Sequence, residues 1–194
     1  ETDEPTLLDL LAVDADLFNK EFFPKTIRQA SPKFHQDMDD ILEDPKHRYV
    51  NFQVFRGGAK TTKIRTYIAR RISYGVSRTI MVVGKNQDHA ILTVGWIKRQ
   101  IEKNKHWCAT YGLKKGKVWR EEIAQIDNEI TGESIWIIAY GILGAVRGVN
   151  LDDYRPDLIV IDDVMDEENT LSQEQREKTK KLVFGALKEG LAPA

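Results

Sequence analysis

The sequence is short of cysteine and of long apolar runs. It has one cysteine, Cys108, among 194 residues, which excludes an internal disulfide framework and favours a buried thiol over a nucleophile. Its longest apolar run, residues 135–146, is too short to span a bilayer, so we expect no membrane partner. None of the four histidines has a partner at the spacing of metal ligands. With 41% hydrophobic and 30% charged residues, the chain is globular in composition and long enough for one sizeable core.

Charge is distributed unevenly along the chain, although the net charge is only −1. Residues 1–55 hold 6 basic and 12 acidic side chains, and residues 121–194 hold 7 and 16. Residues 56–120 hold 16 basic and 2 acidic side chains, a net charge of +14. This basic block could follow a nucleic-acid backbone, or it could be a set of solvated helix faces. Its members include Arg70, Arg71, Lys98, Arg99, Lys103, Lys105, Lys114, Lys115 and Lys117.

A glycine turn lies at the start of the basic block. Gly57 and Gly58 follow a β-branched and aromatic run over residues 48–55, which predicts a strand, and they precede a helical pattern that begins at Lys60. A strand, a glycine turn and a helix present backbone N–H groups and a helix N-terminus to an anion. This order of elements is typical of a phosphate-binding loop.

The residues after the turn have the chemistry that such a loop needs. Lys60 can reach the β- and γ-phosphates of a nucleotide, and the Thr61 hydroxyl can hold Mg²⁺. Two glycines of the usual pattern are replaced, one by Val54 and one by Ala59. A plain glycine turn before a basic helix is therefore the alternative interpretation.

Beyond the loop, strand and helix patterns alternate. Helical stripes cover residues 60–74 and 90–101, and a short apolar run over residues 79–83 predicts a strand buried on both faces. Residues 119–126 and 134–140 indicate a β-hairpin or neighbouring strands. We therefore expect an α/β fold with a mainly parallel central sheet flanked by helices. Residues 1–30 are expected to form a lead segment that packs on this core, which spans residues 31–194.

A buried strand over residues 158–161 is expected to deliver two carboxylates at its C-terminal end. Ligands of open α/β sheets bind at that edge, and Asp162 suits the Mg²⁺ role of the aspartate that ends a nucleotide-binding strand. Asp163 occupies the next position, where many P-loop ATPase motors place the carboxylate that orients the attacking water. Glu167 or Glu168 could take this role if Asp163 is too short to reach. The alternative without a catalytic role is that the two aspartates cap the turn that follows the strand. A phosphate loop and an acidic strand end in one chain favour nucleotide hydrolysis.

Taken together, these features resemble the ATPase domain of a tailed-bacteriophage terminase large subunit, the motor that pumps double-stranded DNA into a procapsid. The resemblance covers roughly residues 31–187. It rests on Arg56 four residues before Lys60, on Gln36 upstream of the loop, and on an Arg-Gly segment at Arg147 and Gly148 ahead of the acidic strand. The Arg-Gly segment is the most specific of these, and helicases share the others.

The resemblance implies a P-loop NTPase fold of the RecA-like (ASCE) type that uses ATP and Mg²⁺. It implies roles for individual residues: contact with adenine at Gln36, contact with phosphates at Arg56, Gly57, Gly58, Ala59, Lys60 and Thr62, Mg²⁺ at Thr61 and Asp162, and an arginine finger at Arg147. Two departures matter. Ala59 replaces a glycine, and Asp163 replaces a glutamate and is shorter by one methylene.

The resemblance also implies partners and a place of action. These are double-stranded DNA, further copies of the chain in a ring, a portal protein and a small terminase subunit, in the host cytoplasm at the procapsid during packaging. A coupling motif and a nuclease domain are expected beyond Ala194. Two other functions remain open at this point: a helicase-like nucleic-acid translocase, and a non-hydrolysing DNA-binding or assembly module with a degenerate nucleotide site.

Overall fold

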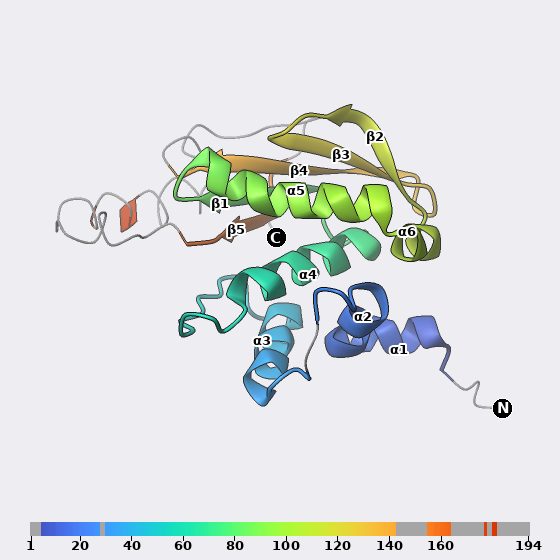
Figure 1. Cartoon of the computed structure of the whole chain (residues 1–194), viewed down its shortest axis with the longest axis horizontal. Helices are drawn as coiled ribbons and strands as arrows, with labels where there is room; N and C mark the ends of the chain where they lie inside the picture. Colours follow the sequence, from blue (N-terminus) through green and yellow to red (C-terminus); the bar gives the residue numbers. More distant parts are fainter. Residues whose placement is uncertain (1–4, 28–29, 143–154, 164–176, 178–179, 182–194) are drawn as a thin grey trace. The chain divides into compact units, whose positions relative to one another are not determined.

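Figure 1 shows the computed structural model of the chain, which describes residues 5–27, 30–142, 155–163, 177, 180 and 181. The chain divides into two compact units, Glu1–Arg70 and Arg71–Ala194. The first unit is helical, and the second is built on a β-sheet. The expected lead segment, residues 1–30, and ATPase core, residues 31–194, stay a prediction.

Three short helices precede the glycine turn in the first unit. They are α1 (Leu7–Val13), α2 (Ala15–Phe22) and α3 (Lys33–Glu43). A capping box between Thr6 and Asp9 starts α1, and it satisfies backbone N–H groups that the first turn of a helix leaves without partners. The aromatic cluster of this unit is buried and consists of Phe18, Phe22 and Phe23.

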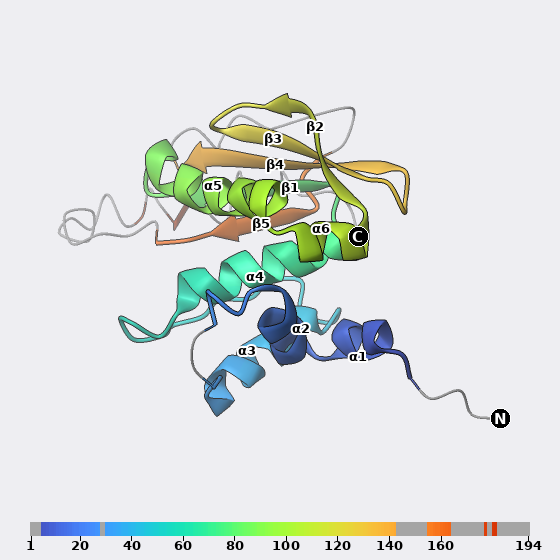
Figure 2. The ribbon, with the colours of Figure 1, turned by 45° about the vertical axis from the view of Figure 1, so that its right-hand side comes forward.

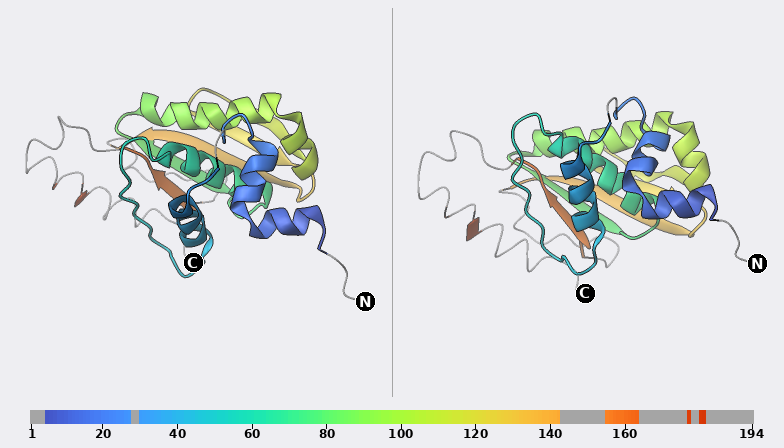
Figure 3. Two further views of the ribbon diagram at one scale, coloured as in Figure 1. Left: turned by 60° about the horizontal axis from the view of Figure 1, so that its bottom comes forward. Right: turned by 90° about the horizontal axis from the view of Figure 1, so that it is seen from below.

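The connection from α3 to the next helix is a long extended loop (Figure 3). The strand predicted over residues 48–55 is wrong, because this segment pairs with no strand of the sheet. Burial nevertheless alternates along it, with Phe52 and Val54 half-buried and their neighbours exposed. β-branched and aromatic residues fit an extended, half-covered backbone, but a strand also needs a neighbour to which its N–H and C=O groups can bond.

Helix α4 (Lys60–Ser73) begins directly after the glycine turn, as predicted. It starts in the first unit and ends in the second. Its end is also as predicted, because Gly75 has a φ of 62°, the left-handed conformation that glycine adopts without strain.

The second unit contains a five-stranded sheet with the order β2-β3-β4-β1-β5 (Figures 1 and 2). Its strands are β1 (Thr79–Gly84), β2 (Leu113–Trp119), β3 (Ile123–Asn128), β4 (Glu133–Gly141) and β5 (Leu158–Ile161). β1 is the predicted buried strand, and all six of its residues are buried. The predicted hairpin is the antiparallel pair of β3 and β4.

The sheet is mixed, which corrects the expectation of a mainly parallel one. β1 pairs in parallel with β4 and β5, whereas β2, β3 and β4 are antiparallel neighbours. β5 is also less buried than predicted, since all four of its residues are only half-buried. The finding therefore supports an α/β fold, and the P-loop NTPase type stays a prediction.

Two consecutive helices of the second unit accompany the sheet (Figure 3). Helix α5 (Gln87–Lys103) packs against β1 and β4, and α6 (Lys105–Tyr111) packs against β2. The predicted helical stripe faces inward, because its four residues are buried: Ala90, Val94, Ile97 and Ile101.

Candidate nucleotide site

The glycine turn has the left-handed backbone that its sequence suggests. Gly57 has a φ of 86°, and the Gly58 N–H donates to the Phe55 carbonyl at 3.1 Å, which closes the turn. A Cβ at Gly58 would overlap the Val54 side chain and lie 3.1 Å from the Phe55 carbonyl oxygen. Glycine is therefore needed at residue 57 for its conformation and at residue 58 for space.

Ala59 also adopts a left-handed conformation, with a φ of 57°, directly before the first turn of α4. Its carbonyl accepts the Lys63 N–H at 3.0 Å, so it forms the first helical hydrogen bond. This backbone region costs a residue with a Cβ about 1 kcal/mol. The position is thus one where glycine fits best, which agrees with the glycine of the usual pattern.

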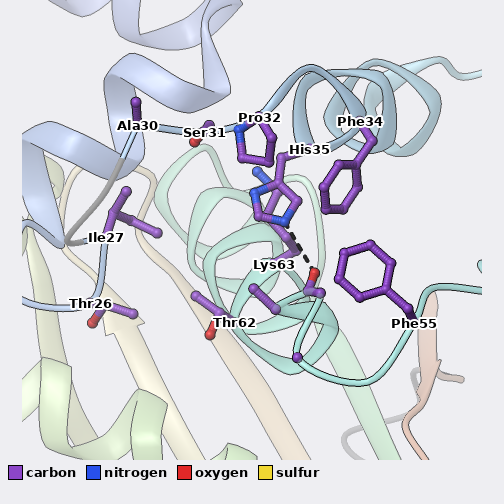
Figure 4. Close-up of a pocket in the computed structure, with 13 residues that line it drawn as sticks. Thr26, Ile27, Ala30, Ser31, Pro32, Phe34, His35, Phe55, Thr62 and Lys63 are labelled. Carbon is purple, nitrogen blue, oxygen red and sulfur yellow. Dashed lines mark hydrogen bonds between the residues drawn. The ribbon is translucent and has the colours of Figure 1, made fainter.

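A pocket of about 370 Å³ opens beside this turn, entirely within the first unit (Figure 4). The segment before α3, the start of α3, the turn and the first residues of α4 line it. The lining residues are Thr26, Ile27, Ala30, Ser31, Pro32, Phe34, His35, Phe55, Gly57, Gly58, Ala59, Thr62 and Lys63.

Two phenylalanines stand at one side of the pocket (Figure 4). The rings of Phe34 and Phe55 are 5.6 Å apart between centroids and inclined by 56°, and Phe55 is 67% exposed. Beside them, His35 Nε2 is 3.1 Å from the Gly58 carbonyl oxygen, so the ring donates a hydrogen bond to the turn when Nε2 carries the proton. Gln36, which was predicted to contact adenine, is exposed and does not line the pocket.

A buried ion pair lies beneath the turn. Lys63 Nζ donates a hydrogen bond to Asp39 Oδ2, and the side chains of Lys63 and Asp39 are only 2% and 11% exposed. Burial raises the pKa of the Asp39 carboxyl, and the hydrogen bond and charge of Lys63 offset only part of this effect. The pair joins α3 to α4 and so links both walls of the pocket.

The two predicted carboxylates lie in the second unit, where β5 ends. Asp162 is 7% exposed, and its N–H donates to the Val83 carbonyl at 2.9 Å. Asp163 is exposed and has a φ of 50°, so the chain turns sharply there. Because β1, β4 and β5 are parallel, their carboxyl ends share one edge of the sheet.

The start of α5 lies on the same edge. A Cβ at Gly84, the last residue of β1, would come within 2.9 Å of the Ala90 nitrogen. One at Gly141, which pairs with Gly84, would come within 3.0 Å of the Gln87 nitrogen. Asp162 and the start of α5 therefore lie at the same end of the parallel strands, the end that ligands use in open α/β sheets.

The structure thus describes most of the predicted site residues in two groups. Lys60, Thr61 and Thr62 are half-buried in the first turn of α4, after Arg56 and the glycine turn, in the first unit. Asp162 and Asp163 belong to the second unit. The remaining candidates, Arg147, Glu167 and Glu168, lie outside the described residues.

Sequence reasoning missed four residues of the first group: Phe34, His35, Asp39 and Lys63. The first two are neighbours of Gln36 but carry no periodic signal. Lys63 looked like one more solvated cation of a basic helix. Only tertiary contacts reveal that Lys63 is buried.

The structure also sorts the basic block. Arg70 is 4% exposed and donates to the main-chain carbonyls of Leu11 (2.8 Å) and Ala12 (3.0 Å) and to Glu43 (2.9 Å). Arg70 therefore fits neither interpretation of the basic block, a nucleic-acid surface or a solvated helix face, because its buried guanidinium binds the helices of the first unit. Arg71 is half-buried and donates to Ser77.

Within the described part of the chain, no helix is long and apolar enough to cross a bilayer. Over the same residues, no three histidine, cysteine or acidic side chains gather as a metal site. The sequence matches no protein-family model and has no significant match among curated proteins.

Proposed function

We propose that this chain is the ATP-hydrolysing motor domain of a viral DNA-packaging terminase, which moves double-stranded DNA into a procapsid. One observation carries the proposal: a glycine turn with two left-handed residues leads directly into α4 at Lys60 and borders a pocket. Lys60 and Thr61 follow the turn as they do in phosphate-binding loops, although Val54 and Ala59 replace two glycines of the usual pattern.

The charge of the turn suits a polyphosphate. The first turn of α4 contains no acidic residue, and it begins with Lys60. The N-terminus of a 14-residue helix adds partial positive charge and N–H groups without helical partners. Arg56 precedes the turn and is exposed. These groups would bind the phosphates, and the Thr61 hydroxyl would hold Mg²⁺, which neutralises charge on the transferred phosphoryl group.

The pocket beside the turn suits the nucleobase. It has the size of ligand pockets in general, and Phe34 and Phe55 offer aromatic faces at one side. His35 hydrogen-bonds to the turn itself, so it would fix the residues around the base relative to the turn that binds the phosphates. Gln36, the next residue of α3, would contact adenine by the family resemblance alone, since it is exposed and does not line the pocket.

Hydrolysis would use the carboxylates of the second unit. Asp162 is the candidate for the Mg²⁺ role, and Asp163, or Glu167 or Glu168, for orienting the attacking water. Arg147 would act in the site of the next subunit of a ring, because phosphoryl transfer needs cationic charge at the γ-phosphate. The portal protein, the small terminase subunit and the host cytoplasm belong to the same proposal through the family resemblance.

Phosphate release from ATP, measured over a range of protein concentrations that allows self-association, tests this function. The Asp163→Asn variant should bind ATP and fail to hydrolyse it, whereas Asp88→Asn, which removes an exposed carboxylate of α5, should behave as wild type. Normal turnover by Asp163→Asn together with loss of turnover in Glu167→Gln or Glu168→Gln would move the role to that glutamate. Absence of both binding and turnover in the wild-type chain would contradict the proposal.

A second function has its own support. Ala59 occupies a position that favours glycine, and residues 48–55 form no strand before the turn. A DNA-binding or assembly module that binds nucleotide without hydrolysing it would tolerate both features. Saturable ATP binding without turnover in any oligomer would favour this module.

A further inference from the structure

The second unit carries an exposed basic surface built around Trp119. The Trp119 Nε1–H donates to Glu102 on α5 at 2.8 Å, so the indole is fixed to the helix. The ammonium groups of Lys98 and Lys115 lie 5.3 and 5.2 Å from the centroid of the indole ring, which is cation–π distance. One tryptophan thus holds one lysine from α5 and one from β2.

Further cations lie on the elements that carry this cluster and on the adjoining helix α6. Residues 98–120 contain eight basic side chains and a single acidic one, Glu102, a net charge of +7. We call the following residues the Lys–Trp surface: Lys98, Arg99, Lys103, Lys105, Lys115, Lys117 and Trp119. Of the six cations, all but Lys98 are exposed. They come from neighbouring elements, because α5 and α6 both pack against β2 (Figure 2).

The backbone of β2 supports this arrangement. The register of β2 against β3 shifts between Lys115 and Trp119, which is a bulge or similar irregularity. Gly116 lies in this shift, and a Cβ there would come within 2.8 Å of the Gln125 carbonyl oxygen. Bulges turn side chains to new directions, so the shift brings Lys115 and Trp119 together although four positions separate them.

Protection of a sheet edge is the simpler explanation for lysines on β2. β2 is an edge strand, and lysine discourages edge-to-edge association. This explanation covers Lys115 and Lys117. It does not cover Arg99 and Lys103 on α5 or Lys105 on α6, nor the contacts that fix Trp119.

We propose that the Lys–Trp surface binds the phosphate backbone of double-stranded nucleic acid without reading its sequence. The positive charge matches a polyanion. Two ammonium groups already lie over the Trp119 ring, which disfavours the stacking of an unpaired base and therefore disfavours a single strand. The choice of duplex DNA as the partner rests on the proposed motor function.

The test measures binding of a fluorescein-labelled DNA duplex of mixed sequence to the full chain by anisotropy, at several salt concentrations between about 50 and 200 mM. The test variant is Lys103→Gln/Lys105→Gln/Lys117→Gln. The matched control is Lys25→Gln/Lys46→Gln/Arg48→Gln, which removes the same charge from exposed positions of the first unit. All six positions are exposed, so both variants should fold, and their thermal unfolding checks this.

The test variant should bind the duplex at least about tenfold more weakly than wild type, and its log–log salt slope should shrink by up to about 2.7, or about 0.9 for each phosphate that no longer meets a cation. The control should weaken binding much less. Equal effects of the two variants would overturn the inference. It would also be overturned if the chain bound single-stranded DNA more tightly than the duplex and Trp119→Leu abolished that binding. Wild-type chain that binds no duplex, with or without ATP, would also overturn it. ATP affinity, measured separately on the same proteins, reports on the nucleotide site independently of these outcomes.

Discussion

Removal of the buried ammonium of Lys63 should destabilise the first unit strongly. In Lys63→Met the Asp39 carboxyl stays buried and loses the ammonium group that donates a hydrogen bond to its Oδ2 atom. Breaking a buried pair in this way costs about 3–5 kcal/mol. The total stability of a domain is about 5–15 kcal/mol, so the loss is a large fraction of it.

The double variant Lys63→Met/Asp39→Leu should recover most of that loss. Burial already raises the pKa of Asp39 in the folded protein, so desolvation outweighs the attraction of Lys63 for this carboxylate. Replacement of a whole buried pair by apolar side chains is often neutral or stabilising by about 1–4 kcal/mol. The free energy of unfolding of the double variant should therefore lie within about 1 kcal/mol of wild type, or above it.

Urea unfolding followed by two probes measures these values. All four tryptophans, Trp96, Trp107, Trp119 and Trp136, belong to the second unit, so their fluorescence reports on it. Far-ultraviolet circular dichroism also reports on helices α1 to α3 of the first unit. A loss below about 1 kcal/mol in Lys63→Met would refute the reasoning, as would a double variant whose loss equals the sum of the two single losses.

Three further predictions concern the turn, the single thiol and the proposed ring. Gly58→Ala should weaken ATP binding and lower stability because its Cβ has no space, whereas Ala59→Gly should preserve both; calorimetry and thermal unfolding measure the pair, and the reverse order would contradict the account. Burial raises the pKa of Cys108 to about 11, above the 9.0 of a free thiol, so between pH 9 and 11 the thiol ionises in the unfolded chain but stays protonated in the folded one. The free energy of unfolding should therefore fall as the pH rises through this range, and it should fall less in Cys108→Ala. An equal fall in both proteins would refute this prediction. Inactive Arg147→Ala chains mixed with inactive Asp163→Asn chains should regain some ATPase activity if Arg147 acts on the neighbouring site, and no recovery in demonstrably mixed rings would refute a role in trans.

The elements predicted from sequence are those whose hydrophobic period is strong. β1 is a continuous apolar run, and α5 carries a buried stripe at helical spacing, so local pattern was enough. β2 was missed because its sequence, LKKGKVW, neither alternates nor forms an apolar run, and its position at the edge of the sheet explains why it can be so polar. Residues 48–55 show the opposite error, because strand propensity alone cannot supply a pairing partner.

The candidate site divides in the same way. The sequence was enough to identify Gly57, Gly58 and Lys60, because adjacent residues determine the conformation of a turn. The pocket could not, since Phe34 and Phe55 are 21 positions apart in the sequence and meet only through the fold. Lys63 lies three positions after Lys60 in a basic helix, and nothing in its neighbours indicated burial.

Binding of ATP to the loop that ends at Lys60 is the claim on which the proposed function depends. Isothermal titration of the chain with ATP in the presence of Mg²⁺ measures it directly, with Lys60→Ala as the test variant and Lys46→Ala, an exposed lysine outside the loop, as the control. A lost charge-assisted hydrogen bond costs about 1.5–3 kcal/mol, so Lys60→Ala should bind at least about 10- to 100-fold more weakly, while Lys46→Ala should bind as wild type. Unchanged ATP affinity in Lys60→Ala would contradict the account.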